Sequence, residues 1–139
     1  MIPVSILAAL LALADPAKGQ TDPEVAARIT PALHECENAS ENGGTYQQAV
    51  CEGAEARRQE QQLDKTWARV MASLPSSRQR ALRDSEQAWI RQREKDCHSE
   101  MGNYVNSTAR YMFAHCMAEA SIRRTLWLER LARAPRKAR

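Results

Sequence analysis

The chain has 139 residues, the length of one domain, and 27% of them are Asp, Glu, Lys or Arg. It contains one Phe, three Trp and three Tyr, too few large side chains for an extensive core, so we expect covalent cross-links to contribute to its stability. The net charge is only +3 and its excess lies at the C-terminus, which argues against a nucleic-acid-binding protein with a basic face and stacking aromatic residues.

The first 14 residues carry no charged side chain and are rich in Leu and Ala. This run is shorter than the about 20 apolar residues that span a bilayer, and small residues fit a signal-peptidase site after Ala14 or Gly19. We therefore predict a signal peptide over residues 1–19, a helical domain over 20–134 and a basic tail over 135–139. The predicted product is periplasmic or secreted, with no stable membrane insertion after cleavage. The alternative is a cytosolic protein that buries this segment as an N-terminal helix.

Two helices are predicted in the first half of the domain. The first covers 24–37 and is interrupted or restarted at Pro31, because proline costs a helix interior about 3 kcal/mol. A turn-rich loop over 38–45 leads into a long helix over 46–74, whose polar part at 52–62 is expected to be exposed to solvent. Its apolar face is formed by Leu63, Trp67, Val70, Met71 and Leu74.

Two further helices are predicted after Pro75. Ser76 and Gln79 have the spacing of a capping box. One side of the helix that follows carries Leu82, Ser85, Trp89, Arg93 and Cys97. A polar loop over 98–107 precedes the last helix, whose expected apolar face is Ala109, Met112, Phe113, Cys116, Ala120, Trp127 and Leu131. With no strand pattern of useful length, we predict an all-α fold, a small bundle of three to four helices.

The tryptophans lie on the apolar stripes of three successive helices, so Trp67, Trp89 and Trp127 are expected to meet in one aromatic core. Arg93 lies one turn after Trp89 on the same side, within reach of a carboxylate or a helix C-terminal carbonyl. A buried structural network around Arg93 is favoured over ligand binding, because polar groups near a core are normally satisfied internally. Gln87 points to another side of the helix.

Four cysteines in a small exported domain favour two disulfides, for which three connectivities are possible. Each histidine lies beside or near a cysteine, so a zinc site is the competing interpretation. No Cys-x-x-Cys is present, and neighbouring residues on a helix point about 100° apart, so Cys97-His98 and His115-Cys116 are poor chelating pairs. We predict no metal site and no cofactor. Because the sequence also lacks a nucleophile elbow, a phosphate loop and a metal-binding helix motif, we predict a protein that is not an enzyme and has no catalytic residues.

The segment from Gln87 to Cys97 reads Gln-Ala-Trp-Ile-Arg-Gln-Arg-Glu-Lys-Asp-Cys, and the pattern Ser121-x-x-Arg124-x-x-x-Leu128 follows it. With this spacing, and with its other cysteines, the chain resembles the N-terminal domain of LprI-type proteins, a bacterial envelope family named for lysozyme inhibition. The resemblance runs from about residue 36 to 131. The chain departs from the family pattern at a few positions: Asp64, Trp67, Ser121, and a Gly-Gly-Ser loop represented only by Gly102 and Ser107.

The resemblance and sequence proximity together favour the pairs Cys36–Cys51 and Cys97–Cys116, each expected to contribute about 3 kcal/mol by closing a loop of this length. The resemblance implies a family motif that includes Gln87, Trp89, Arg93, Ser121 and Arg124.

The function that the resemblance implies is binding to a lysozyme-like muramidase and occlusion of its sugar cleft. We expect the contacts to come from the 99–107 loop, chiefly from Asn103, Tyr104 and Asn106, because a loop beside a disulfide is pre-organised. Lysozymes as a class are basic. A net charge of +3 therefore predicts no electrostatic steering toward them and an affinity that weakens at low salt.

Two other classes of function are left open. The first is a structural, stress or immunity-type envelope protein that binds another protein through a helical face, with the polar run at 52–62 as a candidate surface. The second is a metal-binding sensor that depends on the histidines. A lysozyme turnover assay separates inhibition from both, and metal analysis of the purified protein identifies the sensor.

Overall fold

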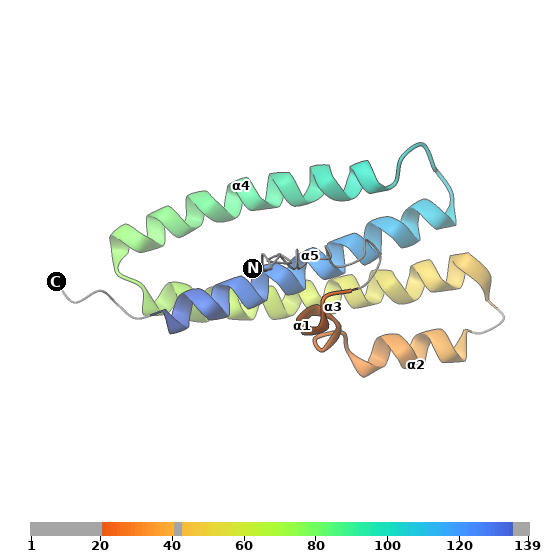
Figure 1. Ribbon diagram of the computed structural model, residues 1–139, viewed down its shortest axis with the longest axis horizontal. Helices are drawn as coiled ribbons and strands as arrows, with labels where there is room; N and C mark the ends of the chain where they lie inside the picture. The colour runs from red at the N-terminus through yellow and green to blue at the C-terminus, as the bar shows by residue number, and fades with distance from the viewer. Residues whose placement is uncertain (1–20, 41–42, 135–139) are drawn as a thin grey trace, which may run out of the picture.

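The computed structural model describes residues 21–40 and 43–134, and within them the chain forms five helices and no strand (Figure 1). The helices are α1 (Pro23–Ala26), α2 (Pro31–Ala39), α3 (Gly44–Ser73), α4 (Ser76–Glu100) and α5 (Ser107–Arg133). The prediction of an all-α fold with two disulfides is confirmed, with one short helix more than expected. The predicted signal peptide and basic tail lie outside the described residues. None of the described helices is both long and apolar enough to cross a membrane.

Proline and glycine set the ends of the first three helices. The side chain of Asp22 caps α1 by accepting a hydrogen bond from the Glu24 N–H at 2.9 Å. Pro31 occupies the first turn of α2, where a backbone N–H would have no acceptor within the helix. The missing N–H of proline therefore costs nothing there, and the chain restarts a helix at Pro31 as predicted. Helix α3 begins at Gly44, whose φ of 62° lies in the left-handed region that glycine adopts without steric cost.

The predicted capping box at the start of α4 is wrong. Pro75 occupies the N-cap position and no side chain caps this helix. Gln79 instead turns back to the end of α3, where its Nε2 donates to the backbone carbonyls of Met71 at 2.9 Å and Leu74 at 3.0 Å. Helix α4 also extends to Glu100, and Gly102 follows with a φ of 56°. The connecting loop is therefore 101–106, shorter than the predicted 98–107.

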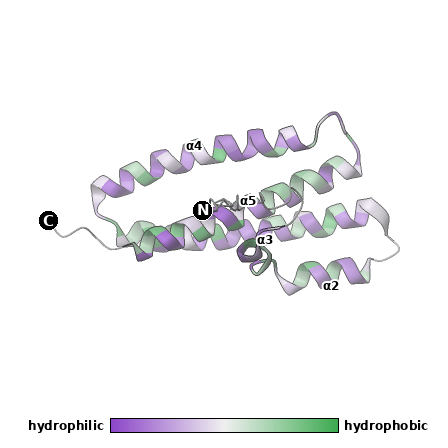
Figure 2. Cartoon of the chain, viewed as in Figure 1, coloured by the Kyte–Doolittle hydropathy of each residue, from purple (hydrophilic) through white to green (hydrophobic). Residues whose placement is uncertain are grey.

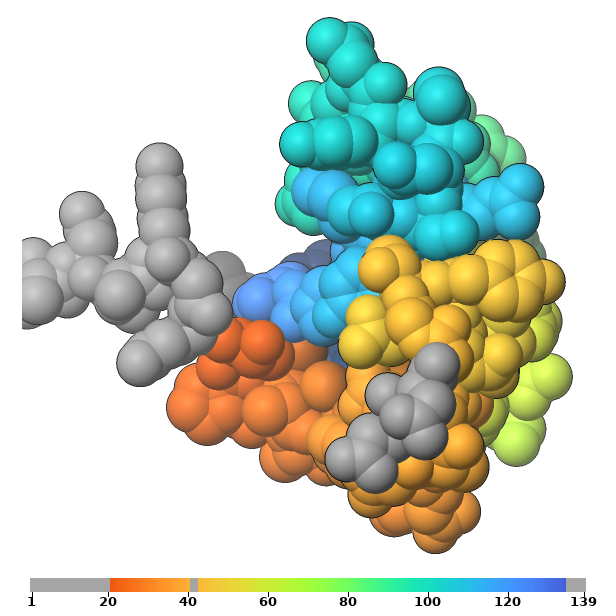
Figure 3. Space-filling view, turned by 90° about the vertical axis from the view of Figure 1, so that its right-hand side faces the viewer, coloured from red at the N-terminus to blue at the C-terminus, as the bar shows by residue number. Residues whose placement is uncertain are grey.

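Helices α3 and α5 run side by side in the same direction, and α4 runs antiparallel to both (Figure 1). Helices α1 and α2 lie on the opposite side of this pair from α4 (Figures 1 and 3). Helix α4 is hydrophilic along most of its length (Figure 2), so it packs through one narrow stripe. Buried apolar side chains of the three long helices form the core: Leu63, Val70, Leu82 and Leu128. The predicted apolar face of α3 is confirmed, since Trp67, Met71 and Leu74 pack against this core.

The two disulfides join neighbouring helices. Cys36–Cys51 links α2 to α3, and Cys97–Cys116 links the end of α4 to α5, with Cα–Cα distances of 5.7 and 5.5 Å. Both pairs are those that the resemblance and sequence proximity favoured. Because α4 is so hydrophilic, we infer that Cys97–Cys116 contributes strongly to holding its C-terminal end against the bundle.

The polar first half of α3 is not the exposed segment that the sequence predicts. Glu52, Glu55 and Gln59 are buried. Glu55 accepts hydrogen bonds from the backbone N–H of Thr30 at 2.9 Å and from its hydroxyl at 2.6 Å. It also accepts one from Gln59 Nε2 at 2.7 Å, and Gln59 in turn donates to the carbonyl of Arg28. The segment between α1 and α2 thus covers this face of α3 with polar partners, which helical periodicity alone does not reveal.

Candidate functional site

Two arginines and two tryptophans form one cluster between α4 and α5, here called the arginine–tryptophan cluster: Trp89, Arg93, Arg124 and Trp127. The guanidinium of Arg93 lies 4.7 Å from the ring centroid of Trp89, and that of Arg124 lies 5.4 Å from Trp89 and 4.1 Å from Trp127. Both arginines are less than 10% exposed. Desolvated guanidinium groups over indole faces give the strongest cation–π contacts, of about 2 kcal/mol.

Both arginines form an ion pair with a glutamate and a hydrogen bond with a serine. Arg124 donates to the Glu86 carboxylate at 2.8 Å and to the Ser85 hydroxyl at 3.0 Å. Arg93 donates to Glu60 at 3.3 Å and to the Ser121 hydroxyl at 3.4 Å. The motif residues Trp89, Arg93, Ser121 and Arg124 are thus brought together, and their role in the fold is to join the hydrophilic helix α4 to the bundle.

One expectation about this region is confirmed and one is wrong. Gln87 is exposed on α4, apart from the cluster, as its place on another side of the helix predicts. The three tryptophans do not form one aromatic core, because Arg124 lies against both Trp89 and Trp127 and the latter is 40% exposed. Within residues 21–40 and 43–134, no two tryptophan rings are in ring contact. Periodicity counts arginine as polar and therefore does not predict its stacking between aromatic residues.

His115 connects two glutamates beside the Cys97–Cys116 disulfide. Its Nδ1 lies 3.1 Å from Glu52 on α3, and its Nε2 lies 3.5 Å from Glu119 one turn along α5. Hydrogen bonds to Glu119 and then to Glu52 outweigh the effect of burial and raise the pKa of His115 to about 10. The same bond to His115 lowers the pKa of Glu119. His115 is therefore a cation at neutral pH and ties α3 to α5.

We predict a pH-dependent contribution of His115 to stability. Its pKa is raised on folding, so the contribution is complete below its unfolded value of about 6.5 and is lost as pH rises through about 10. In urea unfolding at pH 6, 8 and 10, wild type should be more stable than His115→Gln at pH 6, and this difference should shrink toward pH 10. The same difference at all three values would mean that the ion pairs with Glu52 and Glu119 do not form. Comparing the two proteins at each pH removes the titration of other groups.

No group of three or more His, Cys, Asp or Glu side chains that could hold a metal ion occurs in the described part of the chain. His98 packs on the ring of Phe113 at 4.7 Å, and His34 is an exposed residue 3.8 Å from Glu37. All four cysteines are in disulfides.

The loop at 101–106, here called the α4–α5 loop, presents apolar side chains to solvent. Tyr104 is 57% exposed and Val105 is 96% exposed. A hollow of about 280 Å³ beneath them is lined by both helices, including Phe113. Asn106 caps α5, because its side chain accepts hydrogen bonds from the backbone N–H groups of Thr108 and Ala109 at 3.0 and 3.4 Å. Asn103 is exposed. Of the three predicted contact residues, Asn103 and Tyr104 are therefore available to a partner, whereas the Asn106 side chain is used within the fold.

The charges of the molecule are divided between its two ends. The loop end, seen in Figure 3, gathers the α4–α5 loop, α2 and the start of α3, and residues 31–56 contain no Lys or Arg. Exposed or half-buried acids near this end are Glu35, Glu37, Glu94, Asp96 and Glu100, and they outnumber the exposed bases there, Lys95 and Arg110. The stretch 65–83 at the other end contains five bases and no acid: Lys65, Arg69, Arg78, Arg80 and Arg83. Helix α3 alone is about 45 Å long, several times the Debye length of about 10 Å at 0.1 M salt, so a partner at one end responds to local charge.

A family model described as lysozyme inhibitor LprI matches residues 36–128, which is more than half of the chain. The chain belongs to the LprI family. The matched region contains both disulfides, the arginine–tryptophan cluster and the α4–α5 loop. No curated protein and no solved structure matches this LprI-family chain.

Sequence reasoning missed several residues of these sites. Val105 is the most exposed of the large apolar side chains. Its position beside Tyr104 in a polar loop could have indicated an exposed apolar contact residue from the sequence. The acidic partners Glu60 and Glu86 carry no comparable signal, because each lies among other charged residues on a long helix.

Proposed function

We propose that this LprI-family chain is an exported protein that inhibits a lysozyme-type muramidase by binding it with the α4–α5 loop. The observation that carries the proposal is the pair of exposed apolar side chains, Tyr104 and Val105, on a loop between disulfide-linked helices. The family match supports a protein partner, and two disulfides favour an oxidising compartment.

The loop has the physical properties of an inserting segment. Its helices are linked by Cys97–Cys116, and Asn106 fixes the start of α5, so little backbone entropy is lost when a partner binds. Tyr104 offers a rigid aromatic anchor, the residue type that dominates many protein interfaces. Val105 adds apolar area beside it, and Asn103 offers an amide for hydrogen bonding. A muramidase cleft that accepts a sugar chain is a concave, solvent-accessible surface that could admit such a loop.

Local charge also favours a basic partner. The acids around the loop end outnumber its bases, Lys95 and Arg110, and therefore attract a basic enzyme, although the net charge of the whole chain is +3. The affinity for a basic lysozyme should therefore rise as salt is lowered, the reverse of the trend that net charge alone predicts. The alternative envelope-protein function loses support at its candidate surface, because Glu52 and Glu55 of the polar run are buried.

Replacing Tyr104 and Val105 together by Ala should weaken inhibition about 30-fold, which corresponds to about 2 kcal/mol. The matched control is Ile90→Ala, which removes another exposed apolar side chain from α4 away from the loop and should leave inhibition unchanged. Helical circular dichroism and both disulfides should be retained in all variants, because neither loop side chain is part of the core. The measurement is a titration of muramidase turnover.

Asn106→Ala tests whether inhibition depends on side chains that contact the muramidase or on the structure of the loop. It removes the α5 cap and should lower the free energy of unfolding by about 1 kcal/mol, with a smaller effect on inhibition than the Tyr104/Val105 pair. Inhibition that survives the double substitution but is lost with Ile90→Ala would move the binding surface to α4. If wild type inhibits no muramidase, the proposal is wrong.

A further inference from the structure

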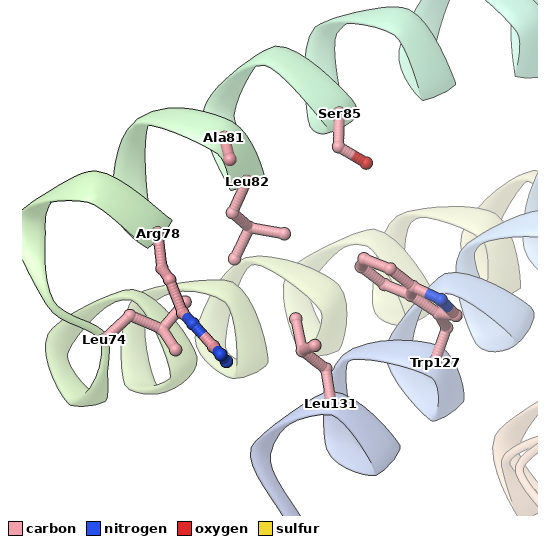
Figure 4. Close-up of a pocket in the computed structure, with 7 residues that line it drawn as sticks. All are labelled: Leu74, Arg78, Ala81, Leu82, Ser85, Trp127 and Leu131. Carbon is pink, nitrogen blue, oxygen red and sulfur yellow. The ribbon is translucent and has the colours of Figure 1, made fainter. Parts of the chain in front are cut away.

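An apolar groove opens at the basic end of the molecule, far from the α4–α5 loop (Figure 4). Its volume is about 280 Å³, near the lower end of the about 300–1,000 Å³ of small-molecule pockets. Helices α4 and α5 and the residue that follows α3 line it: Leu74, Arg78, Ala81, Leu82, Ser85, Trp127 and Leu131.

The walls of the groove are apolar and fixed. Leu82 is buried in the core, and Leu74 and Leu131 pack against that core. Trp127 is 40% exposed, yet its ring is held by the Arg124 guanidinium at 4.1 Å. An aromatic ring that is fixed on one side and open to a groove on the other leaves apolar area for a ligand to cover.

The rim of the groove carries a cation. In Figure 4 the guanidinium of Arg78 extends from α4 toward α3 and Leu74, beside the apolar side chains. Among the described residues Arg78 has no ion-pair partner, and no acid occurs between residues 65 and 83. The groove therefore combines an apolar slot with an unpaired positive charge at its edge.

We propose that this groove binds a long-chain carboxylate. The acyl chain lies against Leu82, Trp127 and Leu131, and the carboxylate pairs with Arg78. Charge complementarity selects an anionic head group, because residues 65–83 contain five bases and no acid. The recessed shape suits a single chain better than a bilayer surface, which needs protruding apolar side chains. This site does not depend on the proposed inhibition, since it lies at the opposite end of the molecule.

Calorimetric titration of the full chain with dodecanoate, below its micelle concentration, tests the proposal. We expect saturable binding that weakens with octanoate, which covers less of the groove, and with dodecyltrimethylammonium, which has the same chain and the opposite charge. Ala81→Leu should weaken binding at least about tenfold, because it fills the groove from an exposed helical position. Arg78→Glu should weaken it about tenfold, whereas Arg80→Glu, an equal change in net charge outside the groove, should alter it less than about twofold.

Several results would overturn the carboxylate site. One is the absence of dodecanoate binding. If vesicles of anionic phospholipid bind the chain while free dodecanoate does not, the groove is a membrane-binding surface. Equal losses with Arg78→Glu and Arg80→Glu would mean diffuse charge attraction. If the chain binds no dodecanoate but forms a dimer, and Ala81→Leu dissociates that dimer, the groove is an interface with a second copy of the chain. Thermal melting of each variant checks that it is folded.

Discussion

Replacing Trp89 by Ala is expected to lower the free energy of unfolding by about 3 kcal/mol, which is a large part of the stability of so small a domain. Trp89 is half-buried, packs against the core and lies under the guanidinium groups of Arg93 and Arg124. Its loss creates a cavity and leaves two buried cations with less compensation. Urea unfolding followed by circular dichroism measures the effect.

The matched control for Trp89 is Gln87→Ala on the same helix. Gln87 is exposed, so this change should stay within about 0.5 kcal/mol of wild type. A Trp89→Ala protein as stable as Gln87→Ala would contradict the role of the arginine–tryptophan cluster in joining α4 to the bundle. Trp127→Ala should fall between the two, because Trp127 is 40% exposed and contacts only one of the two arginines.

Replacing Glu55 by Ala should destabilise the chain by about 2–3 kcal/mol, because it removes a buried carboxylate that accepts several hydrogen bonds. Glu55 is 0% exposed and accepts bonds from Thr30, Arg58 and Gln59. Removing it leaves the Thr30 N–H without its acceptor and deprives Arg58 and Gln59 of one acceptor each, which loosens α2 from α3. Chemical unfolding at neutral pH measures the loss.

The pH dependence of Glu55 gives a second measurement. Burial acts to raise its pKa, but the bonds from Thr30, Gln59 and Arg58 outweigh burial and leave the pKa below its usual value. The contribution of Glu55 to stability is therefore present above its unfolded pKa of about 4.5 and is lost as pH falls below that value.

The control Glu94→Ala removes an exposed carboxylate of α4 and should change stability by less than about 0.5 kcal/mol. Equal stabilities for Glu55→Ala and Glu94→Ala would show that the buried network does not form.

The long helices could be predicted because their signals are local. The apolar face from Leu63 to Leu74, the break at Pro75 and the restart at Pro31 depend on spacing and on proline geometry, and the structure has them as expected. The disulfide pairs came from the family resemblance and sequence proximity. The one-sided pattern of α4 also holds, since Leu82, Arg93 and Cys97 are its buried residues.

The errors about burial have a common physical cause, which is that polar groups are satisfied by partners far away in the sequence. Glu55 is buried by residues about 25 positions earlier, and Glu52 meets His115 from 63 positions later. Arg124 separates two tryptophans that periodicity places in one core. The net charge likewise hid a division between an acidic end and a basic end, because residues close in space are distant in sequence. At the candidate site, the exposed position of Tyr104 was predicted. The capping role of Asn106 was not, because it can be predicted only when the first residue of α5 is known.

We propose that this LprI-family chain inhibits a muramidase through its acidic loop end. The most direct test is a turnover titration of basic lysozymes with the purified, oxidised protein over a series of ionic strengths. We predict inhibition at micromolar protein that strengthens as salt is lowered and that the Tyr104/Val105 double substitution weakens about 30-fold. No inhibition of any lysozyme at micromolar protein, at any ionic strength, would contradict the claim.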